Sequence, residues 1–207
     1  MAPERKVRSE LSQLIRDRVA REILSSTGPQ PGAKPDGIVT IVFTDIEESS
    51  ALVTSLGDER ARALIREHDE LLRSTVREHG GVEVERAGDG FMVAFSTASR
   101  AVQFAIGLQQ GLAERPDAGS SGVRVRIGME TGEVIAEEQG YFGGTVFRAA
   151  RIVEQARGGQ ILASHATALI AGHEGFALTD RGEHELKGFG PQRLFEIAWD
   201  GTAAPEG

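Results

Sequence analysis

The order of the hydrophobic patterns between residues 38 and 129 constrains the fold of this chain more than any other feature. Runs of β-branched or alternating apolar residues, which are typical of strands, begin at four places: Ile38, Val82, Phe91 and Val123. Helical spacing fills the segment from Glu48 to His79 and the segment after Ala98. The order strand–helix–strand–strand–helix–strand is that of the ferredoxin-like unit, in which both helices cover one face of an antiparallel sheet.

Turn residues separate these elements, and a second set of elements follows Met129. Gly57-Asp58 interrupts the first helical segment, and Asp89-Gly90 is a dipeptide typical of β-hairpins. The later part predicts a turn at 131–132, a strand at 134–136, a glycine-rich loop at 140–144, a helix at 145–156, a small helix at 164–171 and strands near 161, 176–179, 183–186 and 194–198. We therefore expect an α+β fold, a ferredoxin-like βαββαβ core with a C-terminal αβ extension.

The chain divides into four expected segments. Residues 1–24 carry apolar side chains at helical spacing and predict an amphipathic helix that docks on the main domain or on its mate in a dimer. Residues 25–37 are rich in proline and glycine and predict a linker, residues 38–200 form the globular domain, and 201–207 form a flexible tail. Because no apolar run approaches the ~20 residues of a membrane span, we expect a cytoplasmic protein without membrane attachment.

Composition removes several classes of function. The 207 residues contain no cysteine, which excludes disulfides, thiolate metal sites and thiol nucleophiles. Acidic residues outnumber basic ones 31 to 23, so the formal charge of −8 disfavours nucleic acid as a partner. A single-stranded RNA binder on this frame would need exposed aromatics and a basic sheet face. The five histidines show no metal-ligand spacing, and we expect His68 and His79, which share one helical face, at the surface or the boundary of the core.

Two aspartates occupy complementary places in the expected sheet. Asp45 ends the first strand, and Asp89 lies in the hairpin that opens the third, which runs antiparallel beside the first. Carboxylates that converge in this way suit Mg²⁺ or Mn²⁺. The helix that begins near Ser49 could receive phosphate oxygens at its N-terminus, which together with metal indicates a nucleoside triphosphate. The structural alternative is that one aspartate caps a helix and the other only forms a turn.

Five motifs in order resemble the class III nucleotidyl cyclase catalytic domain over about residues 38–199. They are Val42-Phe43-Thr44-Asp45-Ile46-Glu47, Ala87-Gly88-Asp89-Gly90-Phe91, Arg126-Ile127-Gly128-Met129-Glu130-Thr131-Gly132-Glu133, Phe142-Gly143-Gly144-Thr145-Val146 with Ala149-Ala150-Arg151, and Leu186-Lys187-Gly188. The resemblance implies cyclisation of a nucleoside triphosphate to its 3′,5′-cyclic monophosphate with release of pyrophosphate. It also implies two Mg²⁺ or Mn²⁺ ions per site and a homodimer with its sites at the interface.

The resemblance also implies roles for individual residues. Asp45 and Asp89 match the metal-binding carboxylates, and Ile46 matches the residue that lends its backbone carbonyl to the metal. Arg151 matches the arginine that stabilises charge on the pentacovalent phosphorus, a role that suits a guanidinium fork. Lys187 matches a lysine on the triphosphate. Arg126 matches a further triphosphate ligand, and a solvated charge on a strand is the alternative.

Two positions expected to read the base depart from the adenylyl cyclase pattern. That pattern has Lys and Asp where this chain has Glu85 and Gly140, whereas guanylyl cyclases resemble this sequence more closely, with Glu and a small residue. A carboxylate only accepts hydrogen bonds, and guanine presents N–H donors where adenine presents an acceptor. We therefore expect a preference for GTP, with Tyr141 able to stack on or shield the base. The alternatives are an adenylyl cyclase, a variant of altered specificity, and Glu85 as a merely exposed strand residue.

A third departure affects the ribose. Phe147 lies one helical turn before Arg151, where the family usually has an asparagine that orients the ribose. Because phenylalanine offers no hydrogen bond, we expect slow turnover. Phe147 and Gly140 also favour a second class of function, a non-catalytic cyclase domain that serves as a regulatory dimerisation partner. A diguanylate cyclase shares the core topology, but its Gly-Gly-Asp/Glu-Glu-Phe hairpin is absent from this sequence.

Overall fold

The computed structural model describes residues 37–115, 123–138 and 140–200. The expected helix over 1–24, the expected tail over 201–207 and the expected linker apart from its last residue lie outside the described residues. Gly37, which we assigned to the end of the linker, is the first residue of strand β1, Gly37–Ile46.

The described strands form one sheet whose centre is the expected ferredoxin-like unit. Hydrogen bonding gives the order β2-β3-β1-β4-β6-β8-β7, and the short strand β5 pairs with β4. The bounds are β2 Val82–Ala87, β3 Gly90–Phe95, β4 Val125–Glu137, β5 Gly140–Phe142, β6 Ile161–Ser164, β7 Leu178–Leu186 and β8 Gly190–Ile197. The antiparallel set β2-β3-β1-β4 confirms the predicted core, and β6, parallel to β4, begins the C-terminal extension.

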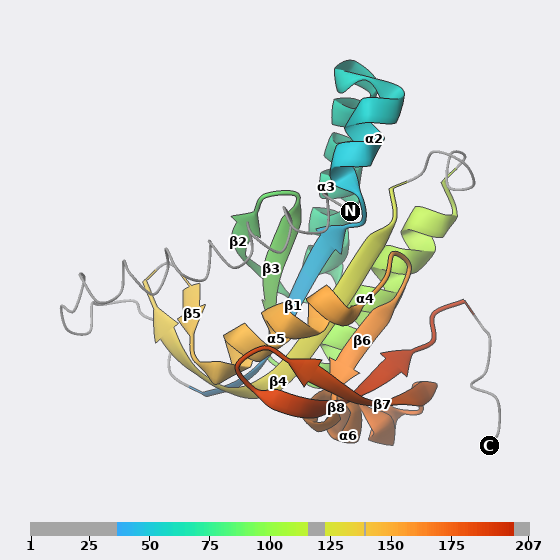
Figure 1. Cartoon of the computed structure of the whole chain (residues 1–207). Coiled ribbons are helices and arrows are strands. Elements are labelled where there is room, and N and C mark those ends of the chain that lie inside the picture. The colour runs from blue at the N-terminus through green and yellow to red at the C-terminus, as the bar shows by residue number, and fades with distance from the viewer. Residues whose placement is uncertain (1–36, 116–122, 139, 201–207) are drawn as a thin grey trace.

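Helices cover both faces of this sheet (Figure 1). Their bounds are α2 Ser49–Leu56, α3 Asp58–Glu78, α4 Ala98–Ala113, α5 Gly144–Gln155 and α6 His165–Ala171, followed by the 3₁₀ turn η1 Gly172–Glu174. The predicted break between α2 and α3 falls at Gly57, whose φ of 76° favours glycine. Among the described residues, no helix is both long enough and apolar enough to cross a membrane.

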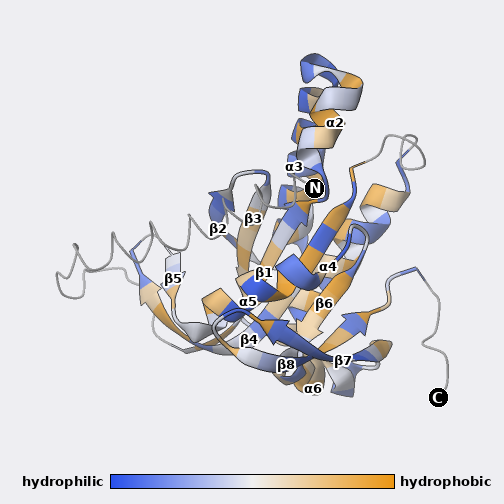
Figure 2. Ribbon diagram, in the orientation of Figure 1, coloured by the Kyte–Doolittle hydropathy of each residue, from blue (hydrophilic) through white to orange (hydrophobic). Residues whose placement is uncertain are grey.

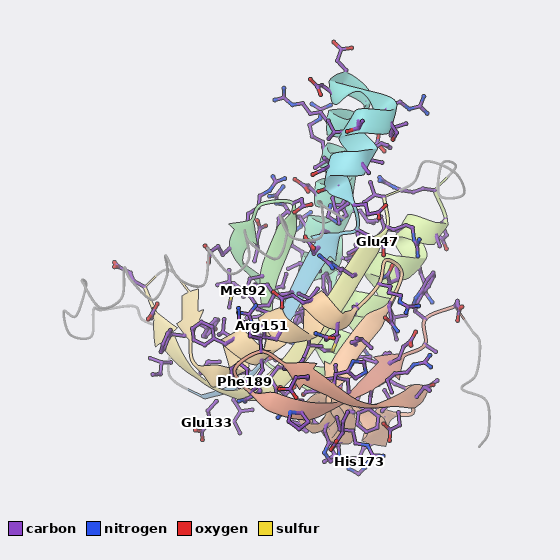
Figure 3. The ribbon with its side chains drawn as sticks, in the orientation of Figure 1. Glu47, Met92, Glu133, Arg151, His173 and Phe189 are labelled. Carbon is purple, nitrogen blue, oxygen red and sulfur yellow. The ribbon has the colours of Figure 1, made fainter. Side chains whose placement is uncertain are left out.

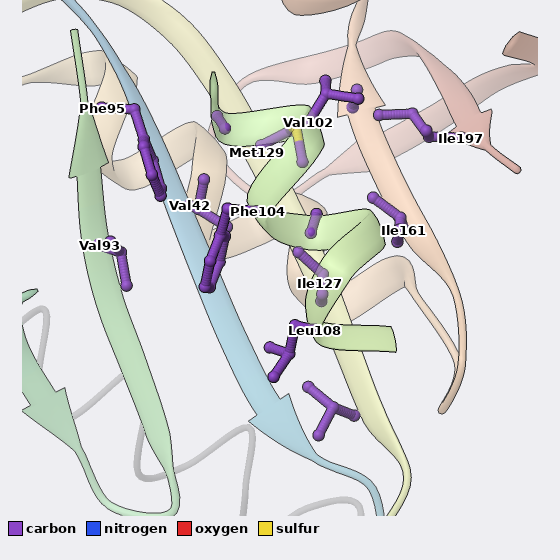
Figure 4. Packing of buried hydrophobic residues seen from close by; sticks show 14 of the residues in the cluster. Val42, Val93, Phe95, Val102, Phe104, Leu108, Ile127, Met129, Ile161 and Ile197 are labelled. Atoms are coloured by element: carbon purple, nitrogen blue, oxygen red, sulfur yellow. The ribbon is translucent and has the colours of Figure 1, made fainter. Parts of the chain in front are cut away.

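Alternation along β1 builds two cores on opposite faces of the sheet. Val42 and Ile46 belong to a large cluster that α3 and α4 close, and Figure 4 shows α4 packed on the strands of this cluster. Ile41 and Phe43 point to the other face and pack with residues of α5. Figure 2 shows apolar residues concentrated on the strands and hydrophilic ones on the far end of α3 and on β7. Asp45, two residues after Phe43, therefore lies on the α5 face.

The predicted turn at residues 131–132 is wrong, because β4 runs through it without interruption. Gly132 pairs with Val39 of β1, and a Cβ on Gly132 would lie 2.7 Å from the Thr145 hydroxyl oxygen. The glycine therefore serves the close approach of α5 to the sheet rather than a turn. Two further expectations also change, since residues 178–186 form one strand and the loop expected at 140–144 begins with strand β5.

A β-bulge in β2 changes which side chains share a face. Glu83 pairs with Val93, but Glu85 pairs with the next residue of β3, Met92, because the register shifts between the two glutamates. Val93 belongs to the core on the α3 and α4 face, whereas Met92 belongs to the core on the α5 face. Glu85 therefore lies on the same face as Asp45, and Glu83 lies on the opposite face.

Candidate functional site

A glycine in the hairpin allows the two aspartates to lie close together. Asp45 is the penultimate residue of β1, and Asp89 lies in the turn between β2 and β3. A Cβ on Gly90 would clash with the backbone carbonyl oxygen of Thr44, so only glycine lets the hairpin approach β1 this closely. The Thr44 hydroxyl oxygen accepts a hydrogen bond of 3.3 Å from the backbone N–H of Phe91 and fixes the same approach.

The electrostatics of this pair fit a cation. The Asp45 side chain is buried, with the residue 4% exposed, and burial together with the nearby Asp89 carboxylate raises its pKa from 3.8 to about 6. The Asp89 Oδ2 atom is buried and has no hydrogen-bond partner among the described residues. Two close carboxylate oxygens, one of them unsatisfied, are hard ligands of the kind that Mg²⁺ and Mn²⁺ take.

A metal here would draw few ligands from side chains. Within the described parts of the chain, no group of three or more histidine, aspartate and glutamate residues could hold a metal ion. Two carboxylates leave the remaining coordination positions to backbone carbonyls, water and substrate oxygens, as Mg²⁺ sites on phosphates commonly do.

Arg126 binds one of these carboxylates directly. It lies opposite Asp45 in the β1–β4 register, and its Nε donates a hydrogen bond of 2.8 Å to Asp45 Oδ2, with Nη2 at the same oxygen. The arginine side chain is 19% exposed, so the alternative of a solvated strand charge is wrong. The guanidinium lowers the pKa of Asp45 and partly offsets the effects of burial and Asp89.

The segment after Asp45 is fixed by Glu47. The Glu47 carboxylate accepts a 2.8 Å hydrogen bond from the backbone N–H of Gly158 and forms an ion pair with Arg124 at 3.2 Å. The backbone N–H of Glu47 donates a hydrogen bond to the carbonyl oxygen of Arg124. The backbone of Ile46, the expected carbonyl ligand, is therefore held on its C-terminal side. Ser49 begins α2 as expected, and no side chain caps that helix.

A second set of expected site residues lies around α5. Glu85, on the α5 face, pairs with Met92, and Met92 packs in one cluster with the buried side chain of Tyr141. Gly140 begins β5 and pairs with Glu137. The structure thus brings the three residues expected at the base into one neighbourhood, with Tyr141 already covered by protein.

Two residues of α5 are engaged within the chain. The rings of Phe147 and Phe142 meet edge to face, with their centroids 5.5 Å apart. Arg151 Nη1 donates a 2.7 Å hydrogen bond to Glu154 on the same helix, and both side chains are 12% exposed. Among the described residues, Arg151 forms no hydrogen bond or ion pair with Asp45 or Asp89. Figure 3 shows Arg151 over the middle of the sheet, with Glu47 toward the end that carries α2.

Lys187 is exposed in the turn between β7 and β8. The neighbouring Gly188 has a φ of 87°, and the N–H of Phe189 closes the turn on the carbonyl of Leu186 at 2.8 Å. The Phe189 ring lies 5.6 Å from the guanidinium carbon of Arg148 on α5. The turn that carries Lys187 is therefore attached to the N-terminal half of α5.

The expected residues thus fall into two groups. The carboxylate cluster comprises Asp45, Ile46, Ser49, Asp89 and Arg126. The second group comprises Glu85, Gly140, Tyr141, Phe147, Arg151 and Lys187. Within the described parts of the chain, no hydrogen bond or ion pair joins Arg151 or Lys187 to the carboxylates.

The sequence analysis missed a buried polar group under the hairpin. His68 is fully buried, against the expectation for the histidines, and Asp69 beside it is 5% exposed and paired with Arg86. The available signal was the helical spacing of Asp69 from Ile65 and Leu72, which places a carboxylate on the apolar side of the helix.

Similarity to known proteins shows the family of the chain. Residues 32–198 match the family model described as "Adenylate and Guanylate cyclase catalytic domain". An uncharacterized protein of Mycobacterium tuberculosis is 37% identical over 159 residues, which cover 74% of this chain and 53% of that protein. The chain thus spans about half the length of this curated relative.

Solved structures give the same family. An adenylate cyclase of Trypanosoma brucei, analysed in its monomeric state, superposes with a TM-score of 0.73 at 28% identity, covering 86% of this chain and 96% of that one. The guanylyl cyclase Cya2 superposes with a TM-score of 0.69 at 26% identity, covering 80% of this chain and 94% of that one. The chain belongs to the family of adenylate and guanylate cyclase catalytic domains.

Proposed function

We propose that this chain is a nucleotidyl cyclase that converts a nucleoside triphosphate into its 3′,5′-cyclic monophosphate and pyrophosphate. The observation that carries the proposal is the convergence of Asp45 and Asp89, with Asp89 Oδ2 buried and unpartnered. In this proposal the two carboxylates and the Ile46 carbonyl hold the metal. Two bound Mg²⁺ or Mn²⁺ ions would promote ionisation of the 3′-hydroxyl and neutralise charge on the triphosphate.

The chain's own residues supply positioning and countercharge. In the reaction the 3′-oxygen forms a bond to the α-phosphorus, the bond from that phosphorus to the bridging oxygen breaks, pyrophosphate leaves, and the hydroxyl proton passes to solvent. Arg151 stabilises the charge that builds on the phosphorus, in keeping with the bidentate geometry of a guanidinium. Arg126, Lys187 and the N-terminus of α2 at Ser49 bind the triphosphate oxygens. A bound metal would supply the countercharge to Asp45, and Arg126 would then be free to bind phosphate oxygens.

We also propose a homodimer in which each site combines two chains. Two observations support this arrangement. Arg151 is paired with Glu154 rather than with the carboxylates, and no hydrogen bond or ion pair of the described residues joins Lys187 to Asp45 or Asp89. The test mixes Asp45→Ala with Arg151→Ala, each inactive alone. Recovery of cyclase activity in the mixture is expected, because one of the two sites in a mixed dimer would be intact. Absence of recovery in a verified mixed dimer would contradict a shared site.

The proposed substrate is GTP. Glu85 on the α5 face accepts hydrogen bonds only, and it would pair with the N1–H and N2–H₂ donors of guanine. ATP is the alternative substrate, either for an adenylate cyclase or for a variant of altered specificity. Solved structures named as an adenylate cyclase and as a guanylyl cyclase resemble the chain about equally, so overall likeness does not decide the base.

The β-bulge provides a matched control for this preference. Glu85→Lys should lower the ratio of the GTP rate to the ATP rate by about 10- to 100-fold, because a donor would face the guanine donors. Glu83→Lys places the same charge change on the same strand but on the opposite face, and should leave the ratio unchanged. Rates of cyclic nucleotide formation with Mn²⁺ and each triphosphate give both ratios. An unchanged ratio in Glu85→Lys would refute the base-reading role.

A non-catalytic regulatory domain is the second candidate function. It is favoured by Phe147, whose ring is engaged with Phe142 and offers the ribose no hydrogen bond, and by the internal pairing of Arg151. Incubation with Mn²⁺ and GTP or ATP separates the candidates. A cyclic product from either triphosphate supports the enzyme. If neither triphosphate gives a cyclic product, the regulatory domain is supported.

A further inference from the structure

A buried carboxylate on α3 lies under the hairpin that carries Asp89. Asp69 has a side chain that is 7% exposed, and its Oδ2 forms a 2.8 Å ion pair with Nη1 of Arg86 on β2. Its Oδ1 lies 3.2 Å from Nδ1 of the fully buried His68. A buried carboxylate is costly unless it is paired and hydrogen-bonded. Both of its oxygens are satisfied here, so Arg86 is held in a defined place by the helix.

The same arginine reaches the tip of the hairpin. Arg86 Nε donates a 3.3 Å hydrogen bond to the carbonyl oxygen of Gly88, the residue immediately before Asp89. Its guanidinium carbon lies 5.4 Å from the centre of the Phe91 ring, two residues after Asp89. Arg86 therefore contacts the backbone or side chain on both sides of Asp89 while its end is fixed to α3.

We propose that Asp69 and Arg86 are positioning residues that set the place of Asp89 for metal. The proposal rests on the proposed function, in which Asp89 is a metal ligand. Among the described residues, no hydrogen bond or ion pair joins Asp69 or Arg86 to Asp45 or to the Asp89 carboxylate. Their effect passes through the backbone at Gly88, so they act on the metal only by orienting the loop that presents Asp89.

The topology explains why this loop needs support. β2 is the outermost strand on its side of the sheet, and it is hydrogen-bonded only to β3 among the described strands. The hairpin tip is fixed to β1 through Gly90 and Phe91, but no second strand of the described chain is hydrogen-bonded to β2. The chain of contacts from Asp69 through Arg86 to Gly88 supplies the missing attachment. Asp89 Oδ2 has no hydrogen-bond partner among the described residues, so this oxygen does not help to hold the loop in place.

The molecule contains a matched control. Arg73 of α3 and Glu83 of β2 form a second ion pair at 2.9 Å, and Arg73 also lies over the Phe91 ring, at 5.2 Å. This pair joins the same helix to the same strand, but Glu83 is near the end of β2 that is remote from Asp89. A general loss of attachment between α3 and β2 should follow from breaking either pair. A specific loss at the metal position should follow only from breaking the Asp69–Arg86 pair.

The experiment measures binding of Mn²⁺ alone to the full chain, with free Mn²⁺ followed by electron paramagnetic resonance. Asp69→Asn and Arg86→Gln should each raise the Mn²⁺ dissociation constant about tenfold, as is typical for residues that orient metal ligands. The double variant should bind Mn²⁺ no more weakly than the single variants, because both residues act through the same contact of Arg86 with Gly88. Glu83→Gln should bind Mn²⁺ as the unchanged protein does.

Amide hydrogen exchange gives a second measurement that does not depend on metal. In metal-free protein, Asp69→Asn and Arg86→Gln should exchange faster at residues 88–91, and Glu83→Gln should not. Urea unfolding confirms that each variant is folded. If Asp69→Asn does not fold, Arg86→Gln carries the test, since the Arg86 side chain is 44% exposed.

The outcomes separate this proposal from the proposed function. Unchanged Mn²⁺ affinity or unchanged exchange at 88–91 in folded Arg86→Gln would overturn the positioning role, and so would an equal effect of Glu83→Gln. Asp89→Ala serves as the reference and should lose most Mn²⁺ binding. If Asp89→Ala binds Mn²⁺ normally, the metal site of the proposed function fails, and exchange at 88–91 still decides whether Asp69 and Arg86 hold the hairpin.

Discussion

The carboxylate cluster and the second group differ in how their polar atoms are satisfied. In the cluster, Asp89 Oδ2 has no partner, and Asp45 and Asp89 face each other with Arg126 as the countercharge. In the second group, Arg151 is neutralised by Glu154, and Tyr141 is buried in an apolar cluster. The cluster therefore has binding capacity that the folded chain leaves unsatisfied, whereas much of the second group is satisfied by its own neighbours.

This difference indicates that the carboxylate cluster is the part of the site that needs a ligand. Close like charges and an unpartnered buried oxygen cost stability, and proteins keep such features mainly where a ligand or a reaction uses them. In the described part of the chain, the second group contains no buried side-chain oxygen or nitrogen without a hydrogen-bond partner. Perturbing the two groups should therefore have opposite signatures, and three predictions test this, ordered by the size of the expected effect.

The largest effect is expected in the carboxylate cluster. Asp45→Ala should lower the rate of cyclic nucleotide formation at least about 100-fold, because a metal ligand and the partner of Arg126 are removed together. Asp180 of β7 is an exposed carboxylate that pairs with Arg193, and β7 is at the opposite end of the strand order from β2. Asp180→Ala should therefore keep the original rate. Initial rates with Mn²⁺ and GTP provide the measurement. Full activity of Asp45→Ala would remove the basis for distinguishing the two groups.

An intermediate effect is expected in the second group. Phe147→Asn should raise turnover about tenfold, because an amide can orient the ribose where a phenyl ring cannot. The same change should lower the free energy of unfolding by about 1 kcal/mol, since the ring contact with Phe142 is lost.

Phe142→Leu is the matched control for this second prediction. It removes the same ring contact from the other side and introduces no hydrogen-bonding group. Stability should fall in both variants, and only Phe147→Asn should turn over faster. Faster turnover in both would show that release of the ring pair, rather than hydrogen bonding to ribose, limits the rate.

The smallest effect is on the stability of metal-free protein. At pH 7.5, Asp89→Asn should raise the free energy of unfolding by about 1 kcal/mol, because repulsion between two carboxylates is removed. Asp180→Asn should give no gain, since Arg193 lowers the pKa of Asp180 and stabilises its charged form. Urea titrations in the presence of a chelator measure both. A loss of stability in Asp89→Asn would mean that the carboxylates do not repel.

The pH dependence has a defined sign. The pKa of Asp45 in the folded chain, about 6, lies above the unfolded value of 3.8, so the folded state binds more protons between these two values. The contribution of Asp45 to stability is therefore greatest below about pH 4 and declines as the pH rises through 6. Asp89→Asn should reduce this decline, because Asp89 is one of the causes of the raised pKa.

Local signals in the sequence predicted most of the elements. The break at Gly57 and the β-branched strand that begins near Ile38 each depend on neighbouring residues, and the structure agrees with both. The expected hairpin also forms, but its turn residues are Gly88 and Asp89, because Gly90 already belongs to β3 and pairs with Ala87. Gly132 was assigned wrongly because a glycine in a strand looks like a turn residue in the sequence. Its actual cause is Thr145 on α5, which approaches from another part of the chain.

Side-chain partners were less accessible to sequence analysis. Nothing near Arg126 in the sequence identifies Asp45, 81 residues away, as its partner. Simple alternation would place Glu83 and Glu85 on one face, and only the bulge separates them. The spacing of Asp69 from Ile65 and Leu72 indicates the apolar side of the helix, but only the packing of α3 shows that His68 and Asp69 are both buried.

Sequence patterns alone predict the order of strands and helices, the convergence of Asp45 and Asp89 at one edge of the sheet, and the family that the motifs indicate. These predictions follow from residue periodicity and turn chemistry, which act over short stretches of chain, and from the rules by which successive elements connect. Tertiary structure alone decided which face Glu85 occupies, how Arg126 and Arg151 are paired, and that Arg86 connects a buried carboxylate to the Asp89 hairpin. Such pairings depend on burial and on distances between remote segments, because the free energy of a charge is set by whatever surrounds it after folding.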